Sequence, residues 1–435
     1  MPVWFRHFYC LLWLVALPVA LARLWWKGRL NRGYRKHWRE RLALNLPGSP
    51  NSPFDLWIHA VSVGEARAMM PLLEALRAPY PNILVTCTTP TGRATAEALL
   101  KGSVTVAYLP FDAPWLISRF LQAAKPKLGL LIETELWPGI CDATKLAGVP
   151  LWLVNARLSQ RSANGYARGG GLTRAMLACL SGIAAQSEDH AVRFRSLGAS
   201  NVHVTGNMKF DMALPEDAAE RAAALANHLG GHVPPKASSS PFWVAGSTRE
   251  GEEVLLLDAL RDHPLRQKAI AVIVPRHPER WDSTIDAARV RGYRVARRTD
   301  VDIPVDTEVI VGDSMGEMLA YYGAASAVVM GGTLSGTGGQ NLIEPFAMGV
   351  PVVLGPSVFN FQQATDEAIA AGAALSVPHA NAALDAVLAW LDDEPLRAAA
   401  GVAATKFVMA HRGATGHTAR VLGQFSSKPS AATDV

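Results

Sequence analysis

The stretch FDLWIHAVSVGEARAMMPLLEAL, Phe54–Leu76, contains the pattern that decides the fold. Its first half is rich in apolar and β-branched residues, which predicts a buried strand at FDLWIHAVSV. Gly64 is predicted to form a turn, and the residues from Glu65 to Leu76 carry apolar side chains at helical spacing. A strand, a glycine turn and a helix together form the repeating unit of parallel α/β sheets.

This unit recurs along the whole chain. In the first half, further strands are predicted at ILVTCTT, VTVAYLP, LGLLIE, LWLVN, GIAAQ and VHVTG. An alanine-rich helix and a Gly/Pro/Ser-rich tail, Leu214 to Pro241, then predict a linker. The second half restarts with predicted strands at FWVAGS, AVIVP, EVIVGD, AVVMGG and PVVLG. The sequence therefore predicts two doubly wound domains, with ligands at the carboxyl ends of the strands and in the cleft between the domains.

Composition agrees with a folded protein of two domains. The chain has 435 residues, of which 49% are hydrophobic and 18% charged, with a formal net charge of +5. These values exclude a disordered chain. The cysteines are Cys10, Cys87, Cys141 and Cys179, and none lies in a C-x-x-C pair. The pattern supports neither a zinc ribbon nor a dithiol motif, so they are predicted to be small apolar residues of the core.

The N-terminal segment differs from the rest of the chain. FYCLLWLVALPVALARLWW, from Phe8, is almost entirely apolar. A basic run follows, made up of Arg23, Lys27, Arg29, Arg32, Arg35, Lys36, Arg39 and Arg41. This order predicts a retained membrane anchor with its basic side in the cytoplasm, not a cleaved signal peptide. The uninterrupted apolar core, Phe8–Ala22, is shorter than the roughly 20 residues of a spanning helix, so spanning and interfacial placements both stay open.

Four polar segments follow predicted strands of the second half: GSTREGE (Gly246–Glu252), PRHPER (Pro275–Arg280), GDSMGEM (Gly312–Met318) and GGQNLIEP (Gly338–Pro345). Helix N-termini favour anions, so together they predict a site for a nucleotide phosphate. A Walker loop and a G-x-G-x-x-G motif are both absent from the sequence, which disfavours ATP and NAD bound in those modes. Alternatively, each segment only caps a helix, a role that needs no ligand. Ser247, Ser314 and Asn341 are suitable capping residues.

Single residues in these segments suit the same ligand. Arg249, Arg276 and His277 add positive charge near the predicted phosphate. Glu344 is predicted to accept hydrogen bonds from ribose hydroxyls, as acids do in Rossmann-type sites. The alternative role of Glu344 is to balance the helix dipole.

The motifs HAVSVGE, IETELWPG, VNARLSQRSANGY, GNMKFD, GSTREGEE, PRHPER, GDSMGEM and GGQNLIEP occur in this order. In this the chain resembles the 3-deoxy-D-manno-octulosonic acid (Kdo) transferases of lipopolysaccharide synthesis, over nearly its whole length. The resemblance implies a GT-B type glycosyltransferase of the α/β class, with two Rossmann-like doubly wound domains facing a cleft, preceded by an N-terminal membrane anchor helix.

The resemblance also implies the reaction and its place. The donor is CMP-Kdo, the acceptor is a lipid A precursor (lipid IVA), and transfer is inverting. Neither a metal nor a cofactor is implied, and no nucleic acid partner. The enzyme is expected at the bacterial inner membrane, with its catalytic domains on the cytoplasmic side. The number of Kdo residues transferred and the oligomeric state stay open.

The expected parts of the chain are an anchor and basic segment (1–41), an acceptor domain (42–213), a linker (214–241), a donor domain (242–425) and a disordered tail (426–435). The donor domain is expected to bind CMP and the first domain to face the acceptor membrane.

By resemblance, Glu65 is the general base, and Glu133 and Lys209 assist the transition state. Glu135 is an alternative to Glu133, because residues two positions apart in a strand lie on the same face. The implied CMP contacts are Pro275, Arg276, Met315, Gly316, Glu317, Asn341, Leu342, Ile343 and Glu344. Possible additional donor contacts are Ser247, Thr248, Arg249 and His277.

The residues alone are also compatible with two other classes of protein. One is a GT-B enzyme that uses a UDP-sugar, and the other is a non-catalytic lipid-binding protein of the same fold.

Overall fold

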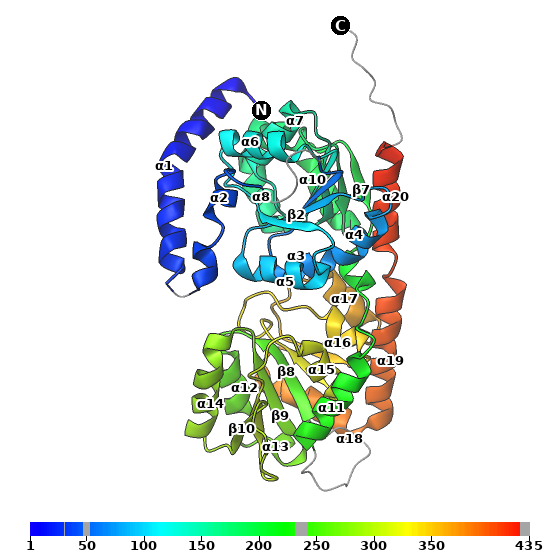
Figure 1. Ribbon diagram of the computed structural model, residues 1–435. Helices are drawn as coiled ribbons and strands as arrows, with labels where there is room; N and C mark the ends of the chain where they lie inside the picture. The colour runs from blue at the N-terminus through cyan, green and yellow to red at the C-terminus, as the bar shows by residue number, and fades with distance from the viewer. Residues whose placement is uncertain (30, 47–52, 231–241, 427–435) are drawn as a thin grey trace. The chain divides into compact units, whose positions relative to one another are not determined.

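The computed structural model describes residues 1–29, 31–46, 53–230 and 242–426. The chain divides into two compact units. Unit 1 contains Met1–Met212 together with the segment from His411, and unit 2 contains Ala213–Ala410. Within the described ranges, each unit is built on a parallel sheet of seven strands, covered by helices (Figure 1).

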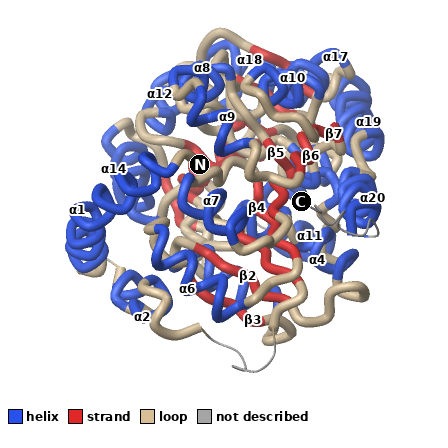
Figure 2. Tube along the Cα trace, turned by 90° about the horizontal axis from the view of Figure 1, so that it is seen from above, coloured by secondary structure: helices blue, strands red, loops and turns tan. Residues whose placement is uncertain are grey.

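The sheet of unit 1 has the order β3-β2-β1-β4-β5-β6-β7. Its strands are β1 (Leu56–His59), β2 (Ile83–Cys87), β3 (Thr105–Tyr108), β4 (Leu128–Ile132), β5 (Leu151–Ala156), β6 (Gly182–Ala185) and β7 (Val202–Val204). Alternate side chains of β1 enter different clusters, since Trp57 packs in the core with Phe120 and Ile58 packs in the core with Leu72. Both faces of the sheet are therefore buried, with helices on either side of the strands (Figure 2).

Unit 1 begins with α1 (Val3–Lys27), η1 (Arg32–Arg35) and α2 (Trp38–Arg41). The helices around its sheet are α3 (Val63–Ala68), α4 (Met70–Leu76), α5 (Pro90–Leu100), α6 (Pro114–Ala124), α7 (Pro138–Leu146), α8 (Gln160–Arg168), α9 (Gly171–Leu177), α10 (Glu188–Ser196), η2 (Met208–Asp211) and the C-terminal α20 (Ala414–Ser426).

The sheet of unit 2 has the order β10-β11-β9-β8-β12-β13-β14. Its strands are β8 (Phe242–Thr248), β9 (Ile270–Pro275), β10 (Val295–Arg297), β11 (Val309–Val311), β12 (Val328–Met330), β13 (Val352–Leu354) and β14 (Ala374–Ser376). Its helices are α11 (Ala218–Gly230), α12 (Glu252–Leu260), α13 (Leu265–Lys268), η3 (Pro278–Arg280), α14 (Trp281–Val290), α15 (Met318–Ala324), α16 (Ile343–Ala347), α17 (Gln362–Ala370), α18 (Ala380–Asp392) and α19 (Glu394–Ala410).

The predicted alternation of strands and helices is confirmed, and so is the prediction of two doubly wound domains. Every strand predicted from the sequence is present, whereas the short edge strands β10 and β14 were not predicted. The predicted turn at Gly64 is wrong: this residue lies in the first turn of α3, which Ser62 caps. The single helix predicted from Glu65 to Leu76 is in fact two, because Pro71 lacks an N–H group and marks the start of α4.

The compact units differ from the expected domain limits in three places. The buried residues Glu40 and Arg41 pack into unit 1, although the expected anchor segment includes them. Part of the expected linker is α11, which packs against α15 of unit 2, while residues 231–241 lie outside the described residues. Helix α20 packs against α4 of unit 1, although its sequence was assigned to the donor domain. Residues 427–435 of the expected tail also lie outside the described residues.

Helix α1 is long and apolar enough to cross a membrane, judged by its length and its mean hydropathy of 1.8 over the most apolar window. The prediction of an apolar N-terminal helix is therefore confirmed. Among the four cysteines, Cys87, Cys141 and Cys179 are buried in unit 1, as predicted, and Cys10 is half-buried on α1.

Candidate active site

Glu65 stands at the N-terminus of α3. The Ser62 hydroxyl oxygen accepts from the Glu65 backbone N–H (3.3 Å), and the Ser62 hydroxyl donates to Glu65 Oε1 (3.0 Å). Glu65 Oε2 accepts from the Val61 backbone N–H (2.7 Å). This is a variant of the capping box, in which a serine and a glutamate three residues later hold each other in place, but the glutamate accepts from the backbone N–H of Val61 instead of that of the N-cap Ser62. The strand-to-helix sequence thus fixes the rotamer of Glu65 without any ligand.

The environment of Glu65 favours its protonated form. Burial is the main cause, and the negative charges of Glu133 and Glu135 add to it. The hydrogen bonds from Val61 and Ser62 lower the pKa, but by less than burial and the two acids raise it. The pKa of the Glu65 carboxyl therefore rises from 4.5 to about 7. A carboxylate with a pKa near the working pH is suited to taking and releasing a proton.

Glu133 lies directly after β4, in a left-handed backbone conformation with φ of 63°. Its side chain is 9% exposed. Its Oε1 lies 2.6 Å from the Lys209 ammonium, and its Oε2 lies 4.0 Å from Arg157 Nε. A left-handed backbone conformation costs a residue other than glycine about 1–3 kcal/mol of folding free energy. Residues strained in this way are concentrated at functional sites.

The order of strands in unit 1 brings these residues together. The chain moves from β1 to β2 and β3 on one side, and then crosses to β4 on the other side of β1. In doubly wound sheets, ligands bind at the carboxyl ends of the strands where the order reverses in this way. Glu65 follows β1 and Glu133 follows β4, so the two carboxylates flank the reversal of unit 1.

Asn155 belongs to the same site but was not predicted. It lies near the end of β5, is fully buried, and has a left-handed φ of 51°. Its Oδ1 accepts from the Met208 backbone N–H (3.0 Å), which fixes the turn that carries Lys209. Within the described part of the chain, Asn155 Nδ2 has no hydrogen-bond partner. An asparagine in the otherwise apolar strand LWLVNA is the signal that reveals it in the sequence.

The expectation that Glu133 and Glu135 share a strand face is wrong. Strand β4 ends at Ile132, and the left-handed residue Glu133 redirects the chain. Glu135 Oε2 accepts from the Trp137 indole N–H (2.7 Å), whereas Glu133 pairs with Lys209. Both acids still act on Glu65 through their charge.

In unit 2, the four polar segments predicted to bind a nucleotide lie at one edge of the sheet. They follow β8, β9, β11 and β12, which are neighbours in the order β11-β9-β8-β12. The strand order of unit 2 reverses between β8 and β12. A Cβ on Gly331, just after β12, would lie 2.3 Å from the Ser247 carbonyl oxygen, so only glycine allows this approach. The sheet therefore places Pro275, Arg276, the 312–318 segment and the 338–345 segment around one reversal point.

Glu252, the last residue of the first segment, bonds to the loop that follows β12 and was not predicted as a site residue. It is 1% exposed. Its Oε2 accepts from the backbone N–H groups of Arg249 (2.7 Å) and Gly332 (2.6 Å). Its Oε1 accepts from the N–H groups of Leu334 (2.8 Å) and Ser335 (3.1 Å). One buried carboxylate thus ties the loop after β8 to the loop after β12.

Under this edge lies Tyr322 of α15, which is buried and touches several predicted residues. The Ser247 hydroxyl hydrogen-bonds to the Tyr322 hydroxyl, and Glu344 and Arg276 act on it through their charges. Burial, the main cause, and the charge of Glu344 raise the pKa of Tyr322. Ser247 has a left-handed φ of 57° and does not cap α12, whose N-cap is Gly251. Thr248 is buried and donates to Glu253.

The remaining predicted donor residues lie on the loops at the same edge. Arg249 Nη1 is 2.9 Å from His277 Nε2, and burial together with Arg249 and Arg276 lowers the pKa of His277. Glu317 accepts from Arg298 (3.0 Å). The exposed Met315 precedes Gly316, whose φ is 84°. Asn341 accepts from the Ile343 backbone N–H (3.1 Å), and Leu342 is buried beside it.

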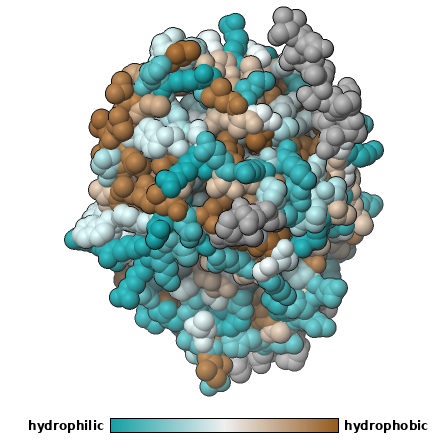
Figure 3. All heavy atoms as spheres, turned by 45° about the horizontal axis from the view of Figure 1, so that its top comes forward, coloured by the Kyte–Doolittle hydropathy of each residue, from teal (hydrophilic) through white to brown (hydrophobic). Residues whose placement is uncertain are grey.

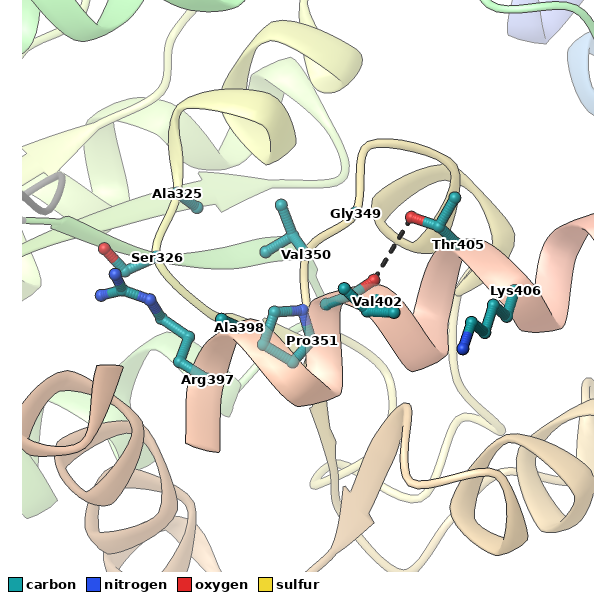
Figure 4. Close-up of a pocket in the computed structure, with 11 residues that line it drawn as sticks. Ala325, Ser326, Gly349, Val350, Pro351, Arg397, Ala398, Val402, Thr405 and Lys406 are labelled. Atoms are coloured by element: carbon teal, nitrogen blue, oxygen red, sulfur yellow. Dashed lines mark hydrogen bonds between the residues drawn. The ribbon is translucent and has the colours of Figure 1, made fainter. Parts of the chain in front are cut away.

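A cavity of about 580 Å³ in unit 2 lies away from these loops. It is lined by α19 and by the residues that precede β12 and β13, with Arg397 beside Ser326 and Lys406 farther along α19 (Figure 4). Since β12 and β13 begin there, the cavity is at the amino edge of the sheet. The predicted donor residues do not line it.

Comparisons with known proteins agree on one family. A family model described as 3-Deoxy-D-manno-octulosonic-acid transferase (kdotransferase) matches residues 36–212. The 3-deoxy-D-manno-octulosonic acid transferase of Bordetella pertussis is 39% identical over 83% of this chain and 85% of its own. That of Haemophilus influenzae is 33% identical over 94% of this chain and 96% of its own.

Among solved structures, UDP-GlcNAc 2-epimerase from Neisseria meningitidis matches with a TM-score of 0.57 and 14% identity. The match covers 86% of this chain and 99% of the epimerase, and it shows the fold alone. The fold is thus of the GT-B type, with two Rossmann-like domains. With the curated relatives matched over most of their length, the chain belongs to the 3-deoxy-D-manno-octulosonic acid (Kdo) transferase family and is a glycosyltransferase.

Proposed function

We propose that the protein transfers Kdo from CMP-Kdo to a hydroxyl of a lipid A precursor at a membrane surface. The observation that carries this proposal is the arrangement of Glu65, Glu133 and Lys209 at the strand reversal of unit 1. Unit 2 would bind the CMP moiety through its loops at the carboxyl edge of the sheet.

In the proposed reaction, Glu65 acts as the general base. The acceptor hydroxyl gives its proton to the Glu65 carboxylate as its oxygen forms a bond to the anomeric carbon of Kdo. The bond from that carbon to the phosphate oxygen breaks, and CMP leaves with the electron pair. A single displacement of this kind inverts the anomeric configuration. The hydrogen bonds that Glu65 makes with Ser62 and Val61 support its role as the base, because a base held in one rotamer needs little reorganisation.

Lys209 is proposed to balance negative charge in this reaction. Kdo carries a carboxylate, and the leaving phosphate gains charge as the bond breaks. The ammonium of Lys209 is 15% exposed and is already held by Glu133 (2.6 Å). A positioned cation near developing negative charge stabilises the transition state. Glu133 is therefore proposed to hold Lys209 in place and to keep the pKa of Glu65 high.

In unit 2, Arg276 and Glu344 are proposed to contact CMP. Arg276 is exposed at the end of β9, where its backbone N–H donates to the Thr248 carbonyl (3.0 Å). Glu344 stands in the first turn of α16, near the buried Tyr322. A guanidinium suits the phosphate, and a carboxylate suits the ribose hydroxyls.

The test offers the purified protein radiolabelled CMP-Kdo or UDP-sugars with a lipid A precursor, and analyses the lipid product by mass spectrometry. The proposal requires Kdo transfer from CMP-Kdo, and the product mass gives the number of residues added. Transfer only from a UDP-sugar, or no transfer by a folded protein, would refute it.

Calorimetry with CMP tests the donor site separately. Glu344→Gln and Arg276→Ala should each weaken CMP binding by about 1.5–3 kcal/mol, the usual cost of a lost charged hydrogen bond. Glu65→Gln, in unit 1, should bind CMP with unchanged affinity. Unchanged CMP affinity in both unit 2 variants would contradict the proposal that these loops bind the nucleotide.

A further inference from the structure

Helix α1 carries a stripe of shielded apolar residues, and its first half packs on unit 1. The partly or fully shielded residues of α1 repeat every three or four positions: Phe5, Tyr9, Trp13, Leu17, Leu21 and Leu24. This spacing is one stripe of an α-helix. Trp13 lies 6.0 Å from Phe111 between ring centroids, and α1 runs beside α2 and α6 (Figure 1).

Polar bonds hold the first half of α1 to α7. Arg6 Nε and Nη2 donate to the two carboxylate oxygens of Asp142 at 2.6 and 2.9 Å. The Tyr9 hydroxyl donates to Asp112 (2.7 Å). Both acids are 7% exposed. A bidentate pair of this kind fixes orientation as well as distance.

The far end of α1 is also held to unit 1. The Trp25 carbonyl accepts from Arg35 of η1 (3.3 Å), and the Arg35 guanidinium lies 5.0 Å from the Trp25 ring. The chain then enters α2, where the buried Glu40 accepts from Arg93 (2.6 Å). Both ends of α1 are therefore attached to the same unit.

The outer face of α1 is apolar and exposed. Trp4 is 68% exposed, Val15 71% and Trp26 63%. Other exposed apolar residues of this face are Val3, Phe8, Leu11, Leu12, Leu14, Val19 and Trp25. Hydrophobic residues gather on the left of the molecule in Figure 3, where Figure 1 draws α1. So large a continuous apolar surface marks an interaction site.

We propose that α1 lies in the plane of an anionic membrane surface as an anchor docked on unit 1, and that it does not cross the bilayer. This rests on the proposed function, which places the protein at a membrane. A spanning α1 would carry Arg6 away from Asp142, or would draw both into hydrocarbon, where burial of a charged residue is unfavourable. An in-plane α1 keeps the pair on the protein side and its apolar face in lipid.

Charge supports a lipid surface as the partner. The segment after α1 carries the basic residues Arg29, Arg32, Lys36 and Arg39, each exposed or half-buried. Each Lys or Arg near an anionic leaflet adds electrostatic attraction to it.

The docked anchor also reaches the candidate active site. Asp112, which accepts from Tyr9, accepts from the backbone N–H groups of Gly139 (2.8 Å) and Ile140 (2.7 Å). These groups form the N-terminus of α7, and the loop before α7 carries Glu133. Docking of α1 therefore supports the loop that holds a proposed catalytic residue.

Thiol labelling of the full-length protein in bacterial inner-membrane vesicles tests the placement. In a Cys10→Ser background, Pro2→Cys reports the start of α1 and Ala98→Cys, on the exposed face of α5, reports unit 1. A membrane-impermeant maleimide is added to right-side-out and to inverted vesicles. An N-terminal Met-Cys extension placed before Met1 repeats the test if Pro2→Cys does not fold.

The proposal requires that both positions be labelled from the same side and protected from the other. Labelling of Pro2→Cys only from the side opposite to Ala98→Cys would show a spanning helix and overturn it. Protection of Pro2→Cys from both sides until detergent is added would also overturn it, because the residue would lie in hydrocarbon.

Kdo transfer to a micellar acceptor, measured on the same vesicles after solubilisation, separates the two proposals. An active protein labelled as a spanning helix would refute only the in-plane anchor. A folded, inactive protein would refute the proposed function.

Discussion

At the scale of single residues, three side chains of unit 1 show how local bonds set chemistry. The capping box fixes the carboxyl of Glu65, and burial with two nearby acids raises its pKa to about 7. Glu133 and Asn155 both hold left-handed backbone at the ends of adjacent strands. Strain of this kind persists only where surrounding bonds over-determine it.

Glu65→Gln should lower transfer by roughly 10²–10⁴, the usual contribution of a general base. Glutamine can keep both contacts if its Oε1 accepts from the Val61 N–H and its Nε2 donates to the Ser62 hydroxyl oxygen, which reverses one bond of the wild type. In the wild type, the rate should rise as pH passes about 7, because the base must be deprotonated. The rate of Glu65→Gln should lack this rise. A pH–rate profile of both proteins, with Glu74→Gln on the exposed face of α4 as control, checks the prediction. Turnover of Glu65→Gln within tenfold of wild type would remove Glu65 as the base.

The same pKa has a consequence for stability. The folded protein holds a proton on Glu65 up to about pH 7, whereas the unfolded chain releases it near 4.5. The free energy of unfolding should therefore fall as pH rises between these values and level off above them. Glu65→Gln should lack this fall. Urea unfolding of both proteins across this pH range measures the difference.

Asn155→Ala should destabilise unit 1 and slow transfer. It leaves the Met208 N–H without its acceptor, at about 1–3 kcal/mol, and places alanine in a left-handed conformation. Asn155→Gly is the matched control, because it relieves the backbone cost but still removes the acceptor. The Asn155→Gly protein should therefore unfold at a higher temperature than the Asn155→Ala protein. Both proteins should show a lower kcat than wild type, because Lys209 is displaced. Unchanged kcat in both variants would show that Asn155 does not position Lys209.

At the scale of elements, a few buried or half-buried acids connect segments that are distant in sequence. Asp211 accepts from the backbone N–H groups of Gly413 (2.6 Å) and Thr415 (2.5 Å), which caps α20 and attaches it to unit 1. Asp112 does the same for α7, where a Cβ on Gly139 would lie 2.2 Å from the Asp112 carbonyl oxygen. Glu252 performs this role between two loops of unit 2.

Glu252→Gln should destabilise unit 2 and weaken CMP binding. An amide cannot accept with both of its heavy atoms, so at least one pair of backbone N–H groups loses its partner, at about 1.5–3 kcal/mol for each bond to a charged group. Glu250→Gln is the matched control on the same loop, since the side chain of Glu250 is 91% exposed. Thermal unfolding and calorimetry with CMP measure both effects. Equal behaviour of the two variants would contradict the role of Glu252.

At the scale of the whole molecule, the N-terminal segment is part of unit 1 and not an appendage. Glu40 accepts from Arg93 (2.6 Å) and from the Tyr108 backbone N–H (2.8 Å). The guanidinium of Arg41 lies 3.8 Å from the centroid of the Tyr108 ring. Removal of residues 1–41 therefore deletes buried partners of unit 1 as well as the apolar helix α1.

A protein that starts at Leu42 should be less stable than one that starts at Asn31. Loss of Glu40 removes one of the two carboxylates that pair with the buried Arg93. Because Glu97 still pairs with Arg93 (2.7 Å), the cost should lie below the about 3–5 kcal/mol of a fully broken buried pair. The shorter deletion removes α1 but keeps this pair. Urea unfolding of both proteins gives the difference, and Glu40→Gln in the full-length chain should reproduce most of it. Equal stability of the two truncated proteins would place the limit of unit 1 after residue 41, as the sequence predicts.

Much of the fold follows from local pattern. Apolar runs ending in glycine, as in FWVAGS, determine where strands form, because their period and length depend on neighbouring residues alone. The apolar stretch from Phe8 determines a long N-terminal helix. The order of motifs determines the family. Glu65, Glu133 and Lys209 were found as residue types in those motifs, although their roles stay proposals.

What local pattern does not contain is the order of strands and the partners of buried groups. Glu65 and Glu133 meet because β4 crosses to the far side of β1, a choice made by contacts between residues far apart in the chain. The return of α20 to unit 1, the left-handed turn at Asn155 and the docking of α1 on Asp142 have the same origin. Sequence periodicity reports which face of an element is apolar, but only packing of the whole chain decides what that face meets.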